Sequence, residues 1–376
     1  MISCLAFDSD RCKSCDFIKL TYEEGLNLKI EKIAKFFNAS LIQKSIKSEV
    51  IEGYRNKGKF IVGGDLDNPI VGIPSPFNKN QISQLTDCPL HSSQINQIAI
   101  LIRDSISEYR LTPYDMESKT GELKYIIISE GYKTEELSIR LGMRSLESFD
   151  RVKKLYSFLT SVNSNIKVFA FDVQAKHAAV FEGEEKLISE SRYIHHRFGA
   201  VELASSTSNF FQVNSHVAEQ LYQKVFDRFC TEDIGSSVDL FCGVGGFAQQ
   251  ISRFSKNVYG IEINSVAIAC AKYSASKNNI SNISFICDDA NNFQNHISEA
   301  VDLLVVNPPR RGIGKDLCHL INKINPKFLV YSSCNATSLA ADIEILSIQY
   351  KVESITPVDM FPLTGHLEVL CFLVRS

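Results

Sequence analysis

Apolar residues in the C-terminal half of the chain alternate between strand-like runs and helical periods. Val217, Leu221, Val225 and Phe229 recur every four residues, which predicts a helix over residues 215–230. Short apolar runs typical of buried strands follow at residues 238–241, 257–263, 283–287, 301–306, 327–331 and 369–374. Continuous apolar strands separated by helices predict an α/β domain, with a parallel sheet covered on both faces.

The first 200 residues have a different pattern. Shorter alternating runs, such as KFIVGGDL, KYIIIS, ELSIRL and VFAFDVQ, predict a mostly β domain with a helix near residues 25–37. We therefore expect two domains: an N-terminal one over residues 1–205, and a C-terminal α/β one over residues 206–376.

Composition narrows the class of protein. The chain has 376 residues, of which 44% are hydrophobic and 22% are charged, as in ordinary globular proteins. Neither a membrane span nor a signal peptide is expected, because no apolar run approaches ~18 residues and no basic stretch opens the chain. The eleven cysteines are odd in number and scattered, which favours a reducing compartment, the cytoplasm, over a disulfide framework. The net charge of −3 gives no global sign of a nucleic-acid partner.

A glycine-rich turn follows the first strand, in VDLFCGVGGF. Gly243 and its neighbouring glycines let the backbone approach a ligand in front of a helix N-terminus. Glu262 ends the next strand, where a carboxylate can bind ribose hydroxyls. This pattern fits NAD and S-adenosylmethionine equally, and a tight packing turn is the plain alternative. Asp289, which could meet an adenine amino group, and the rigid Asn307-Pro-Pro turn favour S-adenosylmethionine.

A thiol stands directly after a strand in VYSSCNAT. Cys334 is expected at the carboxyl edge of the sheet, where enzymes with parallel sheets bind their ligands. Carbon 5 of a pyrimidine is a poor nucleophile, and a thiolate that adds at carbon 6 activates it. That chemistry also needs a base to remove the carbon 5 proton. Glu368 begins the last apolar run and lies beside Cys334 if that strand is antiparallel; a surface glutamate is the alternative.

These motifs together resemble the bacterial RNA uracil-5-methyltransferases. The resemblance rests on DLFCGVGGF, GIEI, VNPPRRGIGK, YSSCNA and HLEVL, with RCKSC, CPL and NFFQVN in the first 214 residues. It implies a Rossmann-like S-adenosylmethionine-dependent methyltransferase domain of seven strands, with the last strand antiparallel. It also implies an N-terminal β-rich RNA-binding domain with an iron–sulfur cluster segment.

The resemblance assigns an activity and residue roles. It implies methylation of carbon 5 of a specific uridine in 23S ribosomal RNA, with Cys334 as nucleophile and Glu368 as base. It implies that Gln212, Phe241, Glu262 and Asn307 hold S-adenosylmethionine. Many relatives have Asp in place of Asn307, so whether Asn307 contacts the uracil or the donor stays open. Neither a membrane nor a stable protein partner is implied.

Cysteines near the N-terminus form a second group of interest. Cys4, Cys12 and Cys15 are followed much later by Cys88, and four thiolates suit zinc or a [4Fe–4S] cluster equally by spacing. The resemblance favours [4Fe–4S], in a structural or RNA-binding role. Arg55, Lys57 and Lys59 alternate in YRNKGKF, on one face if the segment is a strand. They are interpreted either as phosphate contacts or as a solvated strand face.

Other target bases and another class of protein are the alternatives. An adenine-N6 methyltransferase would have an aromatic residue after Asn-Pro-Pro, where this chain has Arg310. A cytosine-5 RNA enzyme would carry a cysteine in that loop. The same chemistry on another 23S uridine or on tRNA is the serious rival. An iron–sulfur RNA-binding protein with an inactive catalytic domain is disfavoured by the intact Cys334, Glu368 and Glu262.

Overall fold

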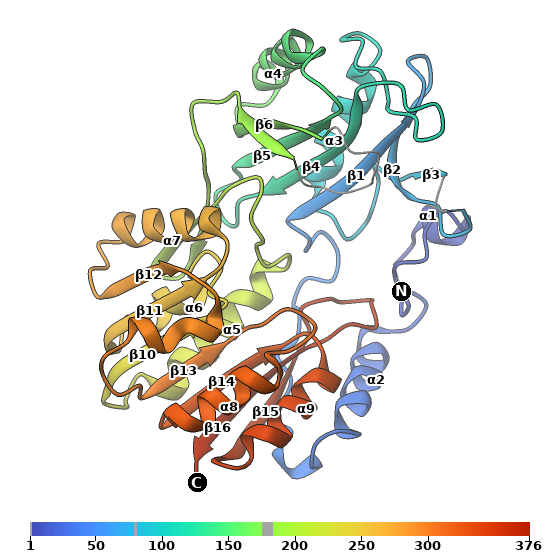
Figure 1. Ribbon diagram of the computed structural model, residues 1–376. Helices are drawn as coiled ribbons and strands as arrows, with labels where there is room; N and C mark the ends of the chain where they lie inside the picture. The colour runs from blue at the N-terminus through green and yellow to red at the C-terminus, as the bar shows by residue number, and fades with distance from the viewer. Residues whose placement is uncertain (1, 79–80, 175–182) are drawn as a thin grey trace.

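Two sheets of seven strands each form the framework of the fold (Figure 1). The computed structural model describes residues 2–78, 81–174 and 183–376. The first sheet has the strand order β3-β2-β1-β4-β5-β6-β7, and the second has the order β12-β11-β10-β13-β14-β16-β15. Figure 1 shows the first sheet above the second.

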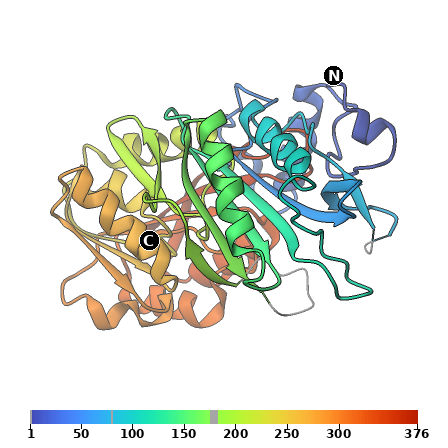
Figure 2. The same ribbon diagram turned by 90° about the horizontal axis from the view of Figure 1, so that it is seen from above.

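The first sheet is mainly antiparallel and carries helices on one face. Its strands are β1 (Lys57–Gly64), β2 (Pro69–Pro74), β3 (Ile82–Gln84), β4 (Leu123–Glu130), β5 (Leu137–Met143), β6 (Ile166–Val173) and β7 (Glu184–Leu187). Helices α3 (Ser93–Ser105) and α4 (Phe149–Val162) lie over it, as the view from above shows (Figure 2). Their residues Ile98 and Leu155 share a core with Phe60 and Ile139 of the strands. The predicted β-rich region therefore contains two helices that the sequence analysis missed.

The second sheet has the topology that the sequence predicts. Its strands are β10 (Ile234–Leu240), β11 (Ser255–Glu262), β12 (Ile283–Cys287), β13 (Leu303–Val306), β14 (Phe328–Ser333), β15 (Tyr350–Val358) and β16 (Glu368–Arg375). Strands β10 to β14 pair in parallel, and β16 runs antiparallel to both β14 and β15. The Rossmann-like sheet with an antiparallel last strand is thus confirmed, and β15 is the strand that the sequence pattern did not reveal.

Helices cover both faces of the second sheet. One face carries α5 (Ser215–Phe229), α6 (Gly246–Ile251) and α7 (Ser265–Lys277). The other carries α8 (Gly314–Ile324), α9 (Ala336–Leu346) and the 3-10 helix η2 (Ala290–His296). Successive strand residues alternate between the two cores: Val305 and Val330 pack on the first side, and Leu304 and Leu329 pack on the second. Burial on both sides explains the continuous apolar runs of these strands.

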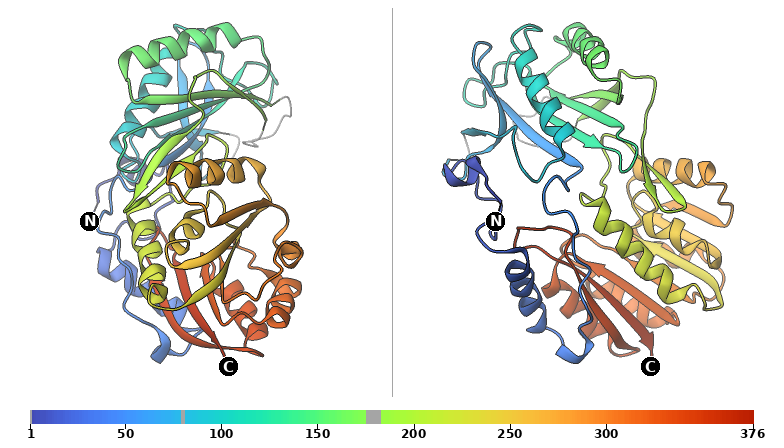
Figure 3. Two further views of the ribbon diagram at one scale, coloured as in Figure 1. Left: turned by 90° about the vertical axis from the view of Figure 1, so that its left-hand side faces the viewer. Right: turned by 180° about the vertical axis from the view of Figure 1, so that it is seen from behind.

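The N-terminal segment extends from the first sheet to the second. It contains α1 (Leu5–Asp8), α2 (Tyr22–Ala34) and the 3-10 helix η1 (Ala39–Leu41). Helix α2 packs Leu26 and Ile33 into the core of the second sheet, and Figure 3 shows it beside the C-terminal strands. Lys29 of α2 forms a buried ion pair of 2.7 Å with Asp359. The division at residues 205 and 206 stays a prediction, and the packing adds that α2 lies with the C-terminal sheet.

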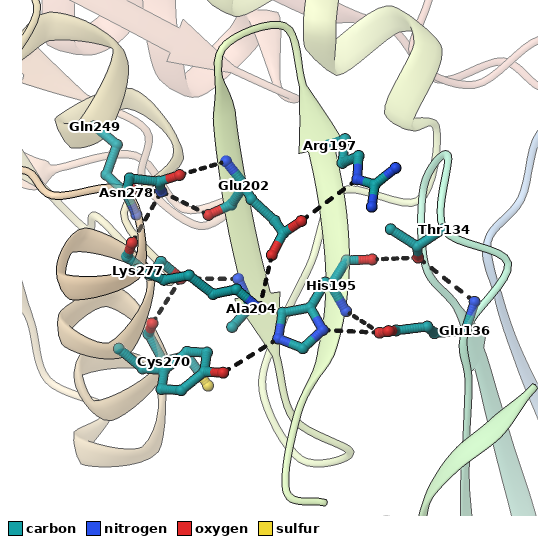
Figure 4. Close-up of polar contacts among 12 residues, drawn as sticks. Thr134, Glu136, His195, Arg197, Glu202, Ala204, Gln249, Cys270, Lys277 and Asn278 are labelled. Atoms are coloured by element: carbon teal, nitrogen blue, oxygen red, sulfur yellow. Dashed lines mark hydrogen bonds and ion pairs between the residues drawn. The ribbon is translucent and has the colours of Figure 1, made fainter.

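A hairpin bridges the two halves of the molecule. It consists of β8 (Ile194–Phe198) and β9 (Val201–Ser205). On one side, the His195 ring and backbone are bonded to the Glu136 carboxylate, with the Nδ1 to Oε2 distance at 2.9 Å (Figure 4). On the other side, Asn278 at the end of α7 bonds both the N–H and the carbonyl of Glu202. The hairpin therefore ties the loop after β4 to helix α7.

Candidate active site

The glycine turn between β10 and α6 adopts a backbone that few side chains tolerate. Gly243 and Gly245 have φ of 54° and 83°. A Cβ added at Gly245 would lie 2.8 Å from the Phe285 ring, whereas one at Gly243 would meet nothing within 4 Å. Phe241 also has a positive φ, 60°, which is costly for an aromatic residue and is typical of functional turns. The turn thus presents open backbone at Gly243.

Glu262, at the end of β11, stabilises the backbone of this turn. Its carboxylate accepts hydrogen bonds from the Gly243 N–H at 3.2 Å and from the Asn264 N–H at 2.9 Å. The side chain is half-buried. The predicted contact of Glu262 with ribose stays a prediction, and the structure adds that this carboxylate holds the backbone of the turn.

Asp239 is a buried acid that the sequence analysis missed. Its Oδ2 accepts a hydrogen bond of 2.8 Å from the Ala248 N–H, and its Oδ1 has no partner among the described residues. Burial raises the pKa of Asp239 to about 8; the Ala248 bond lowers it, and the charge of Glu262 raises it further. An acid inside the apolar run VDLF was the available signal, since a buried carboxylate needs a reason to be there.

The other residues predicted to hold the methyl donor surround the same edge. Asp289 follows β12, is exposed, and caps η2 by accepting the Asn291 N–H at 2.8 Å. Gln212 precedes α5, is half-buried, and its carbonyl accepts a bond of 2.9 Å from Asn56. Asn307 follows β13, and its position is described with Glu368 below. Contact of these side chains with a ligand stays a prediction.

Glu368 lies at the sheet edge where Cys334 was expected. Strands β14 and β16 pair with Ser333 opposite Val369, so the start of β16 adjoins the end of β14. Glu368 is 3% exposed, and its Oε1 accepts hydrogen bonds from Ser332 Oγ at 2.6 Å and from Asn307 Nδ2 at 3.2 Å. Burial raises the pKa of Glu368 to about 7, although both hydrogen bonds lower it. A carboxyl group with this pKa is suited to proton transfer near neutral pH.

Cys334 experiences two opposing charges. It is half-buried, immediately before Asn335, the N-cap of α9. Burial raises the pKa of the Cys334 thiol, and the charge of Glu368 raises it further. The Arg310 guanidinium lowers that pKa, through its charge and through a hydrogen bond. Cys334, Glu368, Asn307 and Arg310 therefore meet at one edge of the sheet.

Arg310 is the residue of this group to which the sequence analysis gave no role. It directly follows the Asn-Pro-Pro turn, and its carbonyl accepts bonds from Asn335 Nδ2 at 2.9 Å and from Ser338 Oγ at 3.1 Å. These bonds tie the turn to the start of α9 beside Cys334. Sequence spacing does not reveal this role, because α8 and β14 separate Arg310 from Cys334 in the chain and the fold brings the cation to the thiol, where it lowers the thiol pKa.

The four N-terminal cysteines line one end of a large cleft. Cys4, Cys12, Cys15 and Cys88 border it, and its volume is about 940 Å³. Burial and the charges of the other three thiols raise the pKa of Cys15 to about 12. No three cysteine, histidine or acidic side chains are arranged to hold a metal ion, as far as the described residues go. The four thiols are thus neighbours, and the cluster itself stays a prediction.

Basic side chains line another part of the same cleft. Arg55, Lys57, Lys59 and Arg140 border it, together with residues 208–211 and Asn264 beside the glycine turn. Lys59 lies opposite Ile127, which in turn lies opposite Arg140, so these residues form a row across β1, β4 and β5. Burial lowers the pKa of Lys57 to about 7, and the charges of Lys59 and Arg140 lower it further. The burial of Lys57 does not fit a fully solvated strand face, and contact of these cations with phosphate stays a prediction.

Comparisons with known proteins agree with the fold and with the motifs. Residues 150–376 match the sequence model of a family described as tRNA (Uracil-5-)-methyltransferase. The chain is 35% identical over 378 residues to a protein of Enterobacter sp. (strain 638) named 23S rRNA (uracil(747)-C(5))-methyltransferase RlmC, with both chains covered completely. The protein of that name from Escherichia coli O139:H28 is 34% identical, again over 100% of both chains.

A solved structure shows the same overall fold. It is the Pyrococcus abyssi tRNA (uracil-54, C5)-methyltransferase in complex with S-adenosyl-L-homocysteine, with a TM-score of 0.81 and 24% sequence identity. The match covers 95% of this chain and 85% of that one, so both sheets are included. Among the described residues, none of the helices has the length and apolar character needed to cross a membrane.

Proposed function

This chain belongs to the tRNA (uracil-5-)-methyltransferase family, and we propose that it methylates carbon 5 of a uridine in 23S ribosomal RNA. S-adenosylmethionine is the methyl donor and 5-methyluridine is the product. The observation that carries the proposal is the meeting of Cys334 with Glu368, whose pKa is raised to about 7 by burial. The full-length relatives named for uracil 747 support that position as the target.

The reaction follows from the two side chains. The Cys334 thiolate adds to carbon 6 of the uracil and pushes an electron pair towards carbon 5. Carbon 5 then takes the methyl group from the sulfonium of the donor, which leaves as S-adenosylhomocysteine. The Glu368 carboxylate removes the carbon 5 proton, the 5,6 double bond forms again, and the thiolate leaves.

Arg310 and Asn307 complete this mechanism. Arg310 lowers the pKa of Cys334, so it favours the thiolate that starts the reaction. The Asn307 Nδ2 group is directed at Glu368 and at the Ser332 carbonyl, at 3.2 and 3.1 Å. We therefore assign Asn307 to the uracil side of the site, where it also holds the base Glu368. This assignment addresses the alternative between uracil and donor that the sequence left open.

The donor site is proposed around the glycine turn. The open backbone at Gly243 leaves room for the methionine part of the donor, and Glu262 binds the ribose hydroxyls. Phe241 and Gln212 would also hold the donor, and Asp289 would meet its adenine amino group. Asp239 adds a buried carboxylate oxygen that lacks a partner among the described residues, and its position next to the turn suits the donor's ammonium group, directly or through water.

We further propose that Cys4, Cys12, Cys15 and Cys88 bind one [4Fe–4S] cluster. The support for this proposal is that all four thiols line a single cleft and that their charges act on each other, which is the chemical type and number of ligands that such a cluster needs. When bound, the cluster would neutralise four thiolates and tie residue 15 to residue 88. Anaerobically purified protein should contain about four irons per chain. Stoichiometric zinc with no iron would contradict the proposal.

The basic cleft is the proposed path of the RNA. Arg55, Lys57 and Lys59 would contact phosphates while the target uridine is turned out of its stack towards Cys334. Affinity for RNA should then fall steeply as the salt concentration rises. A cytoplasmic location is proposed as well, since the eleven cysteines are all free thiols in the described structure.

Methyl transfer to defined RNAs tests the proposed function. Labelled S-adenosylmethionine should transfer its methyl group to an unmodified 23S transcript, with the label at uridine 747, and not to tRNA transcripts. Cys334→Ala serves as the negative control. Label on tRNA alone would mean that tRNA is the substrate in place of 23S RNA. Label on neither RNA would contradict the proposed activity.

A further inference from the structure

The loop that leads into Glu368 is held by the N-terminal cysteine segment, which we define as residues 4–19 together with Tyr54, which packs against them. Residues 359–367 connect β15 to β16, and Glu368 follows directly. The loop starts at Asp359, whose carboxylate and N–H are bonded to Lys29 and to the Ile46 carbonyl. Lys29 also donates to the Phe361 carbonyl at 2.9 Å. The first part of the loop is thus anchored by residues that are far away in the sequence.

The second part of the loop touches residues next to a candidate cluster ligand. The Phe17 N–H donates to the Leu363 carbonyl at 3.0 Å, and the Gly365 N–H donates to Asp16 Oδ2 at 2.9 Å. The Tyr54 hydroxyl donates to the Pro362 carbonyl at 3.2 Å in a buried position. A Cβ at Gly365 would lie 2.9 Å from the Asp16 carboxylate, so a larger residue there would have to displace the Asp16 side chain.

Apolar packing follows the same route. Leu363 has a φ of 64°, and its buried side chain shares a small core with Cys15, Ile18, Tyr54 and Leu90. Cys4 and Cys88 pack against that core. A left-handed leucine is strained, and such a backbone persists where its surroundings hold it. The cysteine segment supplies those surroundings.

The far end of the loop is close to the reacting group. His366 lies two residues before Glu368, and burial, with the charge of Arg310, lowers its pKa, whereas Asp16 raises it. Its electrostatic environment therefore includes both Asp16 of the cysteine segment and Arg310 beside Cys334. The 359–367 loop therefore runs from the cysteine segment to the group of residues around Cys334.

We propose that the cysteine segment positions the catalytic base: Asp16, Phe17 and Tyr54 hold the 359–367 loop so that Glu368 points at the target uracil. This inference rests on the proposed function. Because Cys15 precedes Asp16 directly, any change that releases the four thiols also loosens the loop. The segment then controls the proton-removal step and leaves the addition of Cys334 largely unaffected.

Two substitutions test this positioning role. Asp16→Ala removes the acceptor of the Gly365 N–H, and Tyr54→Phe removes one hydroxyl while it keeps the ring in the core. Asp8→Ala is the matched control, since Asp8 pairs with Lys19 in the same segment and, among the described residues, its side chain forms no hydrogen bond or ion pair with the loop. Iron content is measured for every variant, so that loss of a cluster is separated from loss of a hydrogen bond.

The readouts separate a slow base from a general defect. Hydrogen exchange of residues 359–367 should become about tenfold faster in both variants, the change expected for one lost hydrogen bond. The kcat and the KM for RNA should fall together with kcat/KM unchanged, because the denaturation-resistant protein–RNA adduct accumulates before the slowed last step. The control should match the unsubstituted protein in all three.

Two outcomes would overturn the inference and leave the proposed function intact. One is unchanged exchange and unchanged adduct level in both variants while Cys334→Ala still abolishes methylation. The other is reduced turnover without adduct accumulation, because the loop would then act on a step before proton removal. If the unsubstituted protein methylates no RNA, the proposed function itself fails, which is a different result.

Discussion

Cys334 and Cys15 are both thiols with a raised pKa, but their surroundings differ. Burial and three neighbouring thiols raise the pKa of Cys15 to about 12, and Arg55 opposes this weakly. At Cys334, burial and Glu368 raise the pKa, while Arg310 lowers it by charge and by a hydrogen bond. The first arrangement becomes favourable when an external cation binds the thiols together. The second already contains its cation, so a single thiolate can form and leave during each reaction.

Replacing each thiol in turn should remove a different property: methylation for Cys334 and iron binding for Cys15. Cys334→Ala should reduce methylation by about 10⁴-fold or more, because no other group can activate carbon 5. It should keep its iron and bind S-adenosylmethionine normally. Cys15→Ser should lose the iron. Both are measured by methyl transfer, donor binding and iron analysis.

A second thiol provides the control for this comparison. Cys230 is an exposed cysteine at the end of α5, away from both sites, and Cys230→Ala should behave like the unsubstituted protein. If Cys334→Ala retains substantial turnover, Cys334 is not the nucleophile. If Cys15→Ser keeps four irons per chain, Cys15 is not a ligand of the cluster.

Glu368→Gln should separate the two halves of the reaction. The amide keeps the shape of the side chain and cannot accept the carbon 5 proton, so turnover should fall about 10²–10⁴-fold. The methylated adduct should accumulate as a denaturation-resistant protein–RNA band that carries the labelled methyl group. Adding Cys334→Ala should remove the band.

Glu353→Gln is the matched control for Glu368→Gln. Glu353 lies on β15 in an exposed ion pair with Arg228, so its loss should leave turnover unchanged. Normal turnover of Glu368→Gln would assign the base to another group. RNA binding without any adduct would mean that Glu368 acts before proton removal.

The two halves of the fold differed in how well their sequences predicted them. Strands β10 to β14 were found because burial on both faces makes them continuously apolar. Strand β15 lies at the sheet edge, and its first five residues alternate between buried and more exposed positions, so it lacked that signal. Helices α3 and α4 carry apolar residues at helical spacing, for example Ile95, Ile98 and Ile102, and the same test would have found them.

Long-range packing was outside the reach of the sequence pattern. The helix predicted near residues 25–37 exists as α2, but nothing in its own residues shows that Lys29 meets Asp359, 330 positions later. At the candidate site, the motifs located Cys334 and Glu368, whereas Ser332 and Arg310 were missed as partners. Their roles depend on strand pairing and on a side chain that folds back from the Asn-Pro-Pro turn.

Arg310→Gln should affect the opposite half of the reaction from Glu368→Gln. Without the guanidinium, the pKa of Cys334 rises, so the thiolate fraction at neutral pH falls and adduct formation should become about tenfold slower. Raising the pH should partly restore the rate, because it restores the thiolate. Arg311→Gln, at the next position, is the control. Adduct accumulation in Arg310→Gln would contradict the assigned role.

Ser332→Ala should have the smallest effect and tests the tuning of the base. The Ser332 hydroxyl donates to Glu368 Oε1 at 2.6 Å and lowers the pKa of Glu368, which burial raises to about 7. Without this bond, the pKa of Glu368 should rise further, since the hydroxyl stabilises the charged form and such hydrogen bonds contribute about 1.5–3 kcal/mol. The base acts as a carboxylate, so at pH 7 the active fraction should fall about fivefold. The loss should disappear above pH 9, and the acidic limb of the pH–rate profile should move to higher pH.

Ser333→Ala is the matched control, because the Ser333 hydroxyl bonds the Asn335 carbonyl and not Glu368. An unchanged acidic limb in Ser332→Ala would mean that Glu368 is not the group whose ionisation limits turnover. Arg310, which lowers the pKa of Cys334, would then be the one neighbour left to distinguish the surroundings of Cys334 from those of Cys15.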